Sequence, residues 1–405
     1  MHIISRLRIA GLGIATKVIP FPKPVSFVGP DSSLILCGEI AKAGIKRLTV
    51  ITSAGMHKRG EIDPILTTLR AAGVKADVFD KVEPDPGYET IAAGVKHLQH
   101  TDAQAVLAVG GGSAIDGAKT MVACYANDCH PSKLVGLFKV RKMGVPFYAV
   151  PTTAGTGSEV TIAAVVSDKK ARQKHAIIDP KLVPVMVALD PKLMVGLPKD
   201  ITAATGMDAM THAVESYVST LASSETDALA TAAVTAIVAN LPLVFRKGTD
   251  LKAREKMAQA SYDAGLAFTR SGVGYVHAIS HQLGGLYHVP HGFANAVVMP
   301  YVLDQSMPKI ARRLAELARA AGIGSTAADD VELAEQFIAR IRKMNHDMGI
   351  PQTIAELRRA DFETIIDRAL KEAHGTYAVP QYFSYTDCHD LLMKLLPAKS
   401  SSTRH

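Results

Sequence analysis

The chain has 405 residues, which is enough for two domains, and 48% of them are hydrophobic against 20% charged. Its formal charge of +7 comes from 45 basic and 38 acidic residues that are spread along the whole chain. A nucleic-acid-binding protein concentrates its basic residues in one stripe, so we expect no nucleic-acid partner, whereas a basic balance suits an anionic small molecule. We find no apolar run of roughly 20 residues, so we expect no membrane partner either.

The first residues superficially resemble a signal peptide, because Arg6 and Arg8 precede the apolar stretch Ile9–Ala15. This stretch is short and is broken by Gly11 and Gly13, so we interpret it as an N-terminal strand or arm. The four cysteines form no CxxC pair and no disulfide-like framework: Cys37, Cys124, Cys129 and Cys388. Reduced thiols are typical of a cytoplasmic protein, which is the location that we expect.

Short β-rich runs alternate with helical stretches in the first half of the chain. We predict strands at Arg47–Thr52, Ala76–Phe79, Ala105–Val109 and Phe147–Val150. We predict helices at Ile62–Ala72 and Thr90–His97. Strands that alternate with helices of this length form βαβ units around a mainly parallel sheet. We therefore expect residues 1–200 to form an α/β domain.

After residue 200 the β-rich runs stop, and the apolar residues recur with the period of a helix. We predict helices at Met207–Thr220, Glu225–Val244, Leu251–Phe268, Val276–Tyr287, Pro308–Gly322, Val331–Met348 and Thr353–Ala373. Glycine and proline mark the boundaries between these segments. Residues 201–405 are therefore expected to form an all-helical domain, which ends in a disordered serine-rich tail at Ser400–His405.

A glycine-rich turn, Gly110–Lys119 with the sequence GGGSAIDGAK, directly follows the predicted strand Ala105–Val109. Its three glycines allow the backbone to bend sharply and to approach a ligand closely. The residues from Ser113 onward start a helix, so free N–H groups and the positive end of the helix dipole face the turn. This pattern favours the binding of a pyrophosphate.

A second turn, Pro151–Glu159 with the sequence PTTAGTGSE, follows the predicted strand Phe147–Val150. It adds hydroxyl groups and exposed amides at the same edge of the sheet. Open α/β sheets bind ligands outside the carboxyl ends of their strands, so the two turns together indicate a dinucleotide site.

The second half of the chain contains candidate metal ligands. Asp208 and His212 are four residues apart in a helical stretch, so both lie on one helix face. His277 and His281 have the same spacing in another helical stretch, and His291 follows Pro290. One carboxylate and several imidazoles suit Fe²⁺ or Zn²⁺. His175 and His288, in contrast, stand alone, as surface or core histidines usually do.

Four long motifs match a known family, in the same order along the chain. They are GGGS-x-x-D-x-x-K at Gly110–Lys119, PTTAGTGSE at Pro151–Glu159, G-x-D-A-x-x-H-A-x-E at Gly206–Glu215 and G-x-x-H-x-x-x-H-x-x-G-x-x-x-x-x-P-H-G at Gly274–Gly292. The chain resembles the iron-containing (group III) alcohol dehydrogenases over nearly its whole length. This resemblance implies a Rossmann-like α/β domain with a parallel sheet and an all-α domain, the dehydroquinate synthase-like architecture, with cofactor and metal between them. We also expect a homodimer.

The resemblance also assigns roles to individual residues. The metal ligands carry over to Asp208, His212, His277 and His291. His281 matches a histidine near the substrate and the nicotinamide ribose. Cofactor contacts carry over to Gly111, Gly112, Ser113, Asp116, Thr152, Thr153, Thr161, Lys174 and Leu193. Phe268 and Tyr275 match or neighbour pocket positions, which implies a small or medium, fairly apolar alcohol.

One position departs from the family pattern. Many members that prefer NAD have an aspartate after the second strand, where it binds the adenosine ribose and repels a 2′-phosphate. Here that position is Ser53, and the cations Lys58 and Arg59 follow closely, with His57 beside them. We therefore expect NADP to be accepted as well as NAD.

The implied reaction is oxidation of a primary or secondary alcohol, or reduction of the aldehyde or ketone, by hydride transfer to or from a nicotinamide dinucleotide. The metal, Fe²⁺ or alternatively Zn²⁺ or another divalent ion, would polarise the alcohol oxygen, and His281 would pass the proton to solvent. The alternatives are a glycerol dehydrogenase-like zinc enzyme, a dehydroquinate synthase-like lyase and a nucleotide-binding scaffold without activity.

Overall fold

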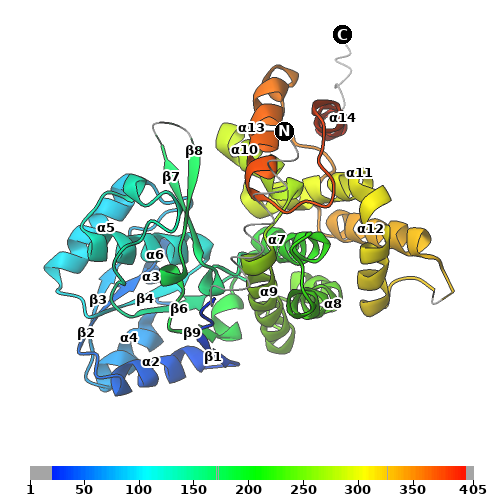
Figure 1. Cartoon of the computed structure of the whole chain (residues 1–405). Helices are drawn as coiled ribbons and strands as arrows, with labels where there is room; N and C mark the ends of the chain where they lie inside the picture. The colour runs from blue at the N-terminus through cyan, green and yellow to red at the C-terminus, as the bar shows by residue number, and fades with distance from the viewer. Residues whose placement is uncertain (1–20, 170, 172, 326, 398–405) are drawn as a thin grey trace, which may run out of the picture.

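The computed structural model describes residues 21–169, 171, 173–325 and 327–397 (Figure 1). The predicted N-terminal strand or arm and the predicted disordered tail lie outside these residues. Within them, an α/β half precedes a helical half, and the change from one to the other falls between Leu189 and Lys199. In Figure 1 the sheet and its helices lie on the left and the helical half on the right. The predicted fold class is confirmed.

The α/β half is built around a six-stranded sheet with the order β1-β9-β6-β4-β2-β3, in which all neighbouring strands are parallel. Its strands are β1 (Val25–Val28), β2 (Arg47–Ile51), β3 (Lys75–Phe79), β4 (Ala105–Gly110), β6 (Phe147–Pro151) and β9 (Met186–Leu189). The central strands β4 and β6 are buried along their whole length. Strands that are covered on both faces lose the polar alternation of an exposed sheet, which is why their sequences read as continuous apolar runs.

Helices cover both faces of this sheet. They are α2 (Ser32–Lys42), α3 (Ala54–Lys58), α4 (Asp63–Ala71), α5 (Tyr88–His100) and α6 (Gly112–Asn127). On β4, Leu107 and Val109 belong to the apolar cluster of α2 and α4, whereas Val106 and Ala108 belong to that of α5 and α6. This division follows from the alternation of side chains along a strand.

A small second sheet was not predicted. It contains β5 (Gly136–Leu137), β7 (Ala163–Asp168) and β8 (Gln173–Ile178) in the order β5-β8-β7, and β7 and β8 form an antiparallel pair. β8 begins with the polar residues Gln173, Lys174 and His175, whereas β7 contains a short apolar run, Ala163–Val166, that was not predicted as a strand.

The helical half contains α7 (Lys199–Val218), α8 (Ser224–Arg246), α9 (Leu251–Ser271), α10 (Tyr275–Tyr287), α11 (His291–Ala320), α12 (Asp330–Asp347), α13 (Phe362–Thr376) and α14 (Tyr385–Leu395). α7 packs against α8, α9 and α11, and every residue from Gly206 to Tyr217 is buried. The central position of α7 explains why its apolar residues show no single stripe.

Three predicted helix starts in this half are wrong. α7 starts at Lys199 and not at Met207. The helix predicted from Pro308 starts at His291 instead, because α11 continues through Pro300 and Pro308. Each proline removes one backbone hydrogen bond, but packing of the helix against α7 and α12 compensates for this loss. Residues 353–361 precede α13 as turns and a short 3₁₀ helix, and α14 was not predicted.

α8 has an apolar character that was not predicted. This helix is long and apolar enough to cross a membrane by length and composition alone, although alanine, threonine and asparagine interrupt its larger apolar residues. In the structure it packs against α7 and α9, and 39% of its most apolar stretch is buried.

A buried lysine ties α6 to the chain that follows the second turn. The Nζ atom of Lys119 donates to the carbonyl oxygens of Thr161 at 2.7 Å and Ala163 at 2.8 Å, and to Thr161 Oγ1 at 3.0 Å. Burial, partly offset by the carboxylates of Asp116 and Glu159, lowers the pKa of Lys119 to about 8. These bonds fix the two turns relative to each other.

Replacing Lys119 with methionine preserves the length of the side chain but removes the Nζ donor. We expect Lys119→Met to lower the free energy of unfolding by about 2 kcal/mol, because the carbonyl oxygen of Thr161 loses its donor while that of Ala163 keeps Thr161 Oγ1, and one unsatisfied buried acceptor costs about 1–3 kcal/mol. Urea unfolding measures this difference, with the exposed Lys96→Met on α5 as the matched control. Equal unfolding free energies for the two variants would contradict the assigned role of Lys119.

Candidate metal and dinucleotide site

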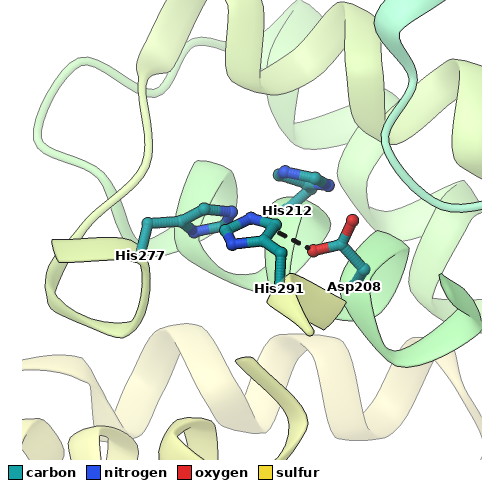
Figure 2. Close-up of side chains that lie close together, drawn as sticks. All are labelled: Asp208, His212, His277 and His291. Carbon is teal, nitrogen blue, oxygen red and sulfur yellow. Dashed lines mark ion pairs between the residues drawn. The ribbon is translucent and has the colours of Figure 1, made fainter. Parts of the chain in front are cut away.

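Four polar side chains converge where α7, α10 and α11 meet (Figure 2). Asp208 and His212 come from α7, His277 from α10 and His291 from the first residue of α11. One donor atom from each residue lies within 4.8 Å of the donor atoms of the other three. The structure therefore brings together all four residues that the sequence predicted as metal ligands.

Close packing of helices positions these side chains. A Cβ atom at Gly292 would lie 2.4 Å from the carbonyl oxygen of Ala204 and 3.1 Å from Cβ of Asp208. Only glycine allows the first turn of α11 to approach α7 this closely. As a result, His291 Nε2 lies 3.7 Å from Asp208 Oδ1.

The donor set fits a divalent cation. Burial lowers the pKa values of His277 and His291 well below 6.5, so both imidazoles are neutral and each offers a lone pair. The Nδ2 atom of buried Asn295 lies 2.7 Å from Asp208 Oδ1, 3.1 Å from His291 Nε2 and 3.3 Å from His277 Nε2. One amide group reaches three of the four donors, so their lone pairs converge on one small volume. Carboxylate and imidazole donors in such an arrangement suit Fe²⁺ or Zn²⁺.

Hydrogen bonds fix the tautomers of two of these histidines. Nδ1 of His212 lies 3.3 Å from the carbonyl oxygen of Gly155. Nδ1 of His277 lies 2.6 Å from Oε2 of Glu215. Because the carbonyl and the carboxylate accept, Nδ1 carries the proton in both rings and Nε2 keeps its lone pair.

Glu215 belongs to the motif Gly206–Glu215, but no role was predicted for it. It is buried on α7 and also accepts from the backbone N–H groups of Gly274 at 2.9 Å and Val276 at 2.7 Å. Burial raises its pKa to about 7, against the effect of these donors. Its position seven residues after Asp208, on the same helix face, was the available signal.

His281 lies beside the four converging residues. Its ring stacks on that of His291 with a centroid distance of 5.2 Å, and its Nδ1 lies 2.6 Å from Oε1 of Glu372. The side chain of His281 is 28% exposed, whereas that of His277 is 4% exposed. His281 is therefore in contact with solvent next to the candidate metal site.

The two predicted turns lie against each other at the carboxyl ends of β4 and β6. A Cβ atom at Gly112 would lie 2.6 Å from the side chain of Thr156, and one at Gly111 would lie 3.4 Å from that of Thr153. α6 starts at Gly112 without a side-chain cap, so the first N–H groups of the helix are free for an anion. The second turn also reaches the candidate metal site through the contact between Gly155 and His212.

Several predicted cofactor residues contact other parts of the protein. The carboxylate of Asp116 accepts from Ser158 Oγ and from Val165 N at 3.0 Å. Buried Thr161 accepts from Lys119, and buried Thr152 lies next to Met56. Asp116 and Thr161 thus connect α6 to the second turn.

The other predicted cofactor residues are spread around the turns. Ser113 Oγ accepts from the backbone N–H of Asp85 at 3.2 Å, and Lys174 Nζ pairs with the carboxylate of Asp85 at 2.7 Å. Leu193 lies in the 3₁₀ helix Pro191–Met194 and packs on the apolar cluster of α2 and α4. Ser53 follows β2 and caps α3.

Comparisons with known proteins agree with this geometry. The family model "Iron-containing alcohol dehydrogenase" matches residues 24–191, and "Fe-containing alcohol dehydrogenase family, C-terminal" matches residues 202–396. The chain is 36% identical over 378 residues to an NAD-dependent methanol dehydrogenase of Bacillus methanolicus, covering 93% of this chain and 99% of that one. It is 37% identical over 355 residues to a 1,3-propanediol dehydrogenase of Klebsiella pneumoniae, covering 87% and 92%.

The fold agrees as well. The solved structure of an alcohol dehydrogenase from Oenococcus oeni, 33% identical, superposes with a TM-score of 0.90 over 93% of this chain and 100% of that one. The chain therefore belongs to the iron-containing alcohol dehydrogenase family and is an oxidoreductase that acts on alcohols.

Proposed function

We propose that Asp208, His212, His277 and His291 hold one divalent cation, and that the turns after β4 and β6 bind a nicotinamide dinucleotide beside it. The observation that carries this proposal is the convergence of four donor atoms within 4.8 Å, in contact with the second turn through Gly155. Fe²⁺ is the ion that the family name supports, and Zn²⁺ or another divalent ion suits the same donors.

The reaction is the transfer of a hydride from the alcohol carbon to C4 of the nicotinamide, with release of one proton. When bound, the metal supplies Lewis-acid polarisation of the alcohol oxygen. The free N–H groups at the start of α6 bind the pyrophosphate and so fix the position of the dinucleotide. His281 accepts the alcohol proton at Nε2 and passes it to solvent, which its partial exposure permits.

The relatives are named for methanol, 1,3-propanediol, 1-propanol and long-chain alcohols, so primary alcohols are the substrate class that they favour. The ring of Phe268 stacks on that of His212 at 4.3 Å and forms an apolar wall next to the candidate metal site. Tyr275, in contrast, is buried against Phe383 and its hydroxyl bonds within the protein. The homodimer and the cytoplasmic location stay predictions from the sequence.

These relatives disfavour the alternatives of a glycerol dehydrogenase-like enzyme and a dehydroquinate synthase-like lyase. An assay of NADH oxidation separates an active dehydrogenase from an inactive scaffold. We expect oxidation of NADH with a panel of small aldehydes, and loss of this activity after treatment with a chelator.

The ligand assignment predicts the effect of single substitutions. We expect Asp208→Ala or His277→Ala to abolish metal retention and activity, while the melting temperature of the metal-free protein changes little, because the helices keep their apolar faces. Metal analysis of anaerobically purified protein and aldehyde reduction measure these effects. The matched control is His346→Ala, an exposed histidine on α12. Stoichiometric metal and near-wild-type turnover in either variant would refute the assignment.

Glu215 is expected to act through His277. Replacing it by leucine removes the acceptor that fixes the Nδ1 proton, so we expect the affinity for the metal to fall by about 10- to 100-fold. Competition with a chelator measures this affinity without relying on turnover. An unchanged affinity would mean that the hydrogen bond between Glu215 and His277 has no role in metal binding.

We infer that the enzyme accepts NADPH as well as NADH. Ser53 is uncharged, the nearby Asp80 is paired with His57 at 2.8 Å, and Lys58 is exposed within the same segment. Ser53→Asp would add a charge that repels a 2′-phosphate and binds the ribose hydroxyls of NAD. We expect this change to lower kcat/KM with NADPH far more than with NADH. If the ratio of the two kcat/KM values stays constant, Ser53 does not lie at the adenosine ribose.

A further inference from the structure

A glutamate outside all the motifs reaches the active-site histidine. Glu372 lies near the end of α13, 91 residues after His281, and its Oε1 is 2.6 Å from Nδ1 of His281. The motifs of the second half end at Gly292, so they contain no residue of α13.

The carboxylate of Glu372 is held from three sides. Tyr377 donates its hydroxyl to Oε1 at 2.6 Å, and Gln282 donates Nε2 to Oε2 at 3.1 Å. Gln282 also donates to the carbonyl oxygen of Ala278, which fixes the orientation of its amide. Both carboxylate oxygens therefore accept hydrogen bonds from other side chains. These bonds hold the carboxylate of Glu372 in place next to His281.

The contact determines which nitrogen of His281 can react. A carboxylate that receives these donors accepts a hydrogen bond, so Nδ1 of His281 carries the proton. Nε2 is then the ring nitrogen that remains for an alcohol, a ribose hydroxyl or a water molecule. The same contact fixes the plane of the ring, which stacks on His291 with an angle of 17° between the planes.

Packing of α13 does not require this side chain. The buried face of the helix is formed by Ile365, Ile366, Ala369 and Ala373, whereas the side chain of Glu372 is 26% exposed. On α10, His277 makes an equivalent 2.6 Å contact with Glu215 of α7. His277 and His281, one helical turn apart, therefore each contact a different carboxylate. Glu215 contacts His277, the candidate metal ligand, and Glu372 contacts His281, the candidate proton carrier.

We propose that Glu372 is a positioning residue for the reaction, which holds His281 in the Nδ1-protonated tautomer with Nε2 free for the transferred proton. This inference rests on the proposed function of His281. Glu372 acts only through His281, so its removal has no further effect once the imidazole is absent.

The test is a double-mutant cycle in the metal-loaded enzyme, with Glu372→Ala, His281→Ala and the double variant. We expect His281→Ala to keep its metal and to lower kcat about 100-fold, as for loss of a group that transfers a proton. Glu372→Ala is expected to lower kcat about tenfold with KM for the alcohol and for NAD within about twofold, a fraction of the loss that the imidazole itself causes. In the His281→Ala background the same change should alter kcat by less than about twofold, since it has no imidazole left to position.

Glu363→Gln, an exposed change on the same helix, is the matched control, and metal content and melting temperature are measured for every variant. If Glu372→Ala does not fold, Glu372→Met replaces it, because methionine has a similar length but no oxygen that can accept from Nδ1 of His281. Equal losses from the Glu372 change in both backgrounds would overturn the inference and leave the role of His281 intact. Full activity of metal-loaded His281→Ala would overturn the role of His281, and the inference with it.

Discussion

The helical half depends on the pairing of polar side chains that α7 carries into the interior. Asp208, His212 and Glu215 are each at most 5% exposed, and a buried polar or charged group costs several kcal/mol if it has no partner. Glu215 is satisfied by three N–H donors from the start of α10, and His212 by a carbonyl of the second turn. Asp208 and the Nε2 atoms of His277 and His291 share a single amide donor, Asn295, so their lone pairs converge where a cation would be bound.

Close backbone contacts at three glycines join the parts of this site. Gly292 brings α11 onto α7, Gly155 lies against Thr205 of α7, and Gly157 lies against Gly265 of α9. At each position a Cβ atom would come within 3 Å of backbone or side-chain atoms. The turn that carries Gly155 and Gly157 also packs on the glycine-rich turn after β4, so the candidate dinucleotide and metal sites are adjacent for steric reasons.

The sequence predicted much of this arrangement and missed specific parts. Four of the six strands in the main sheet, β2, β3, β4 and β6, and most of the helices were predicted because each has a strong period or a continuous apolar run. β1, β9, the small sheet and the first 17 residues of α11 were missed. In α11, Pro300 and Pro308 suggest a helix end that packing overrides. The four predicted metal ligands, in contrast, do lie together in the structure, although three different helices supply them.

The sequence by itself determined what local spacing controls: the shared helix face of Asp208 and His212, the glycine-rich start of α6, and the apolar strands that place both turns at one sheet edge. Only the tertiary structure decided the pairs between distant segments, which are Lys119 with Thr161, Glu215 with His277, and Glu372 with His281. The periodicity of a segment shows which of its faces is buried but not which other segment will pack there. The sequence of α13 alone therefore does not indicate that Glu372 contacts His281.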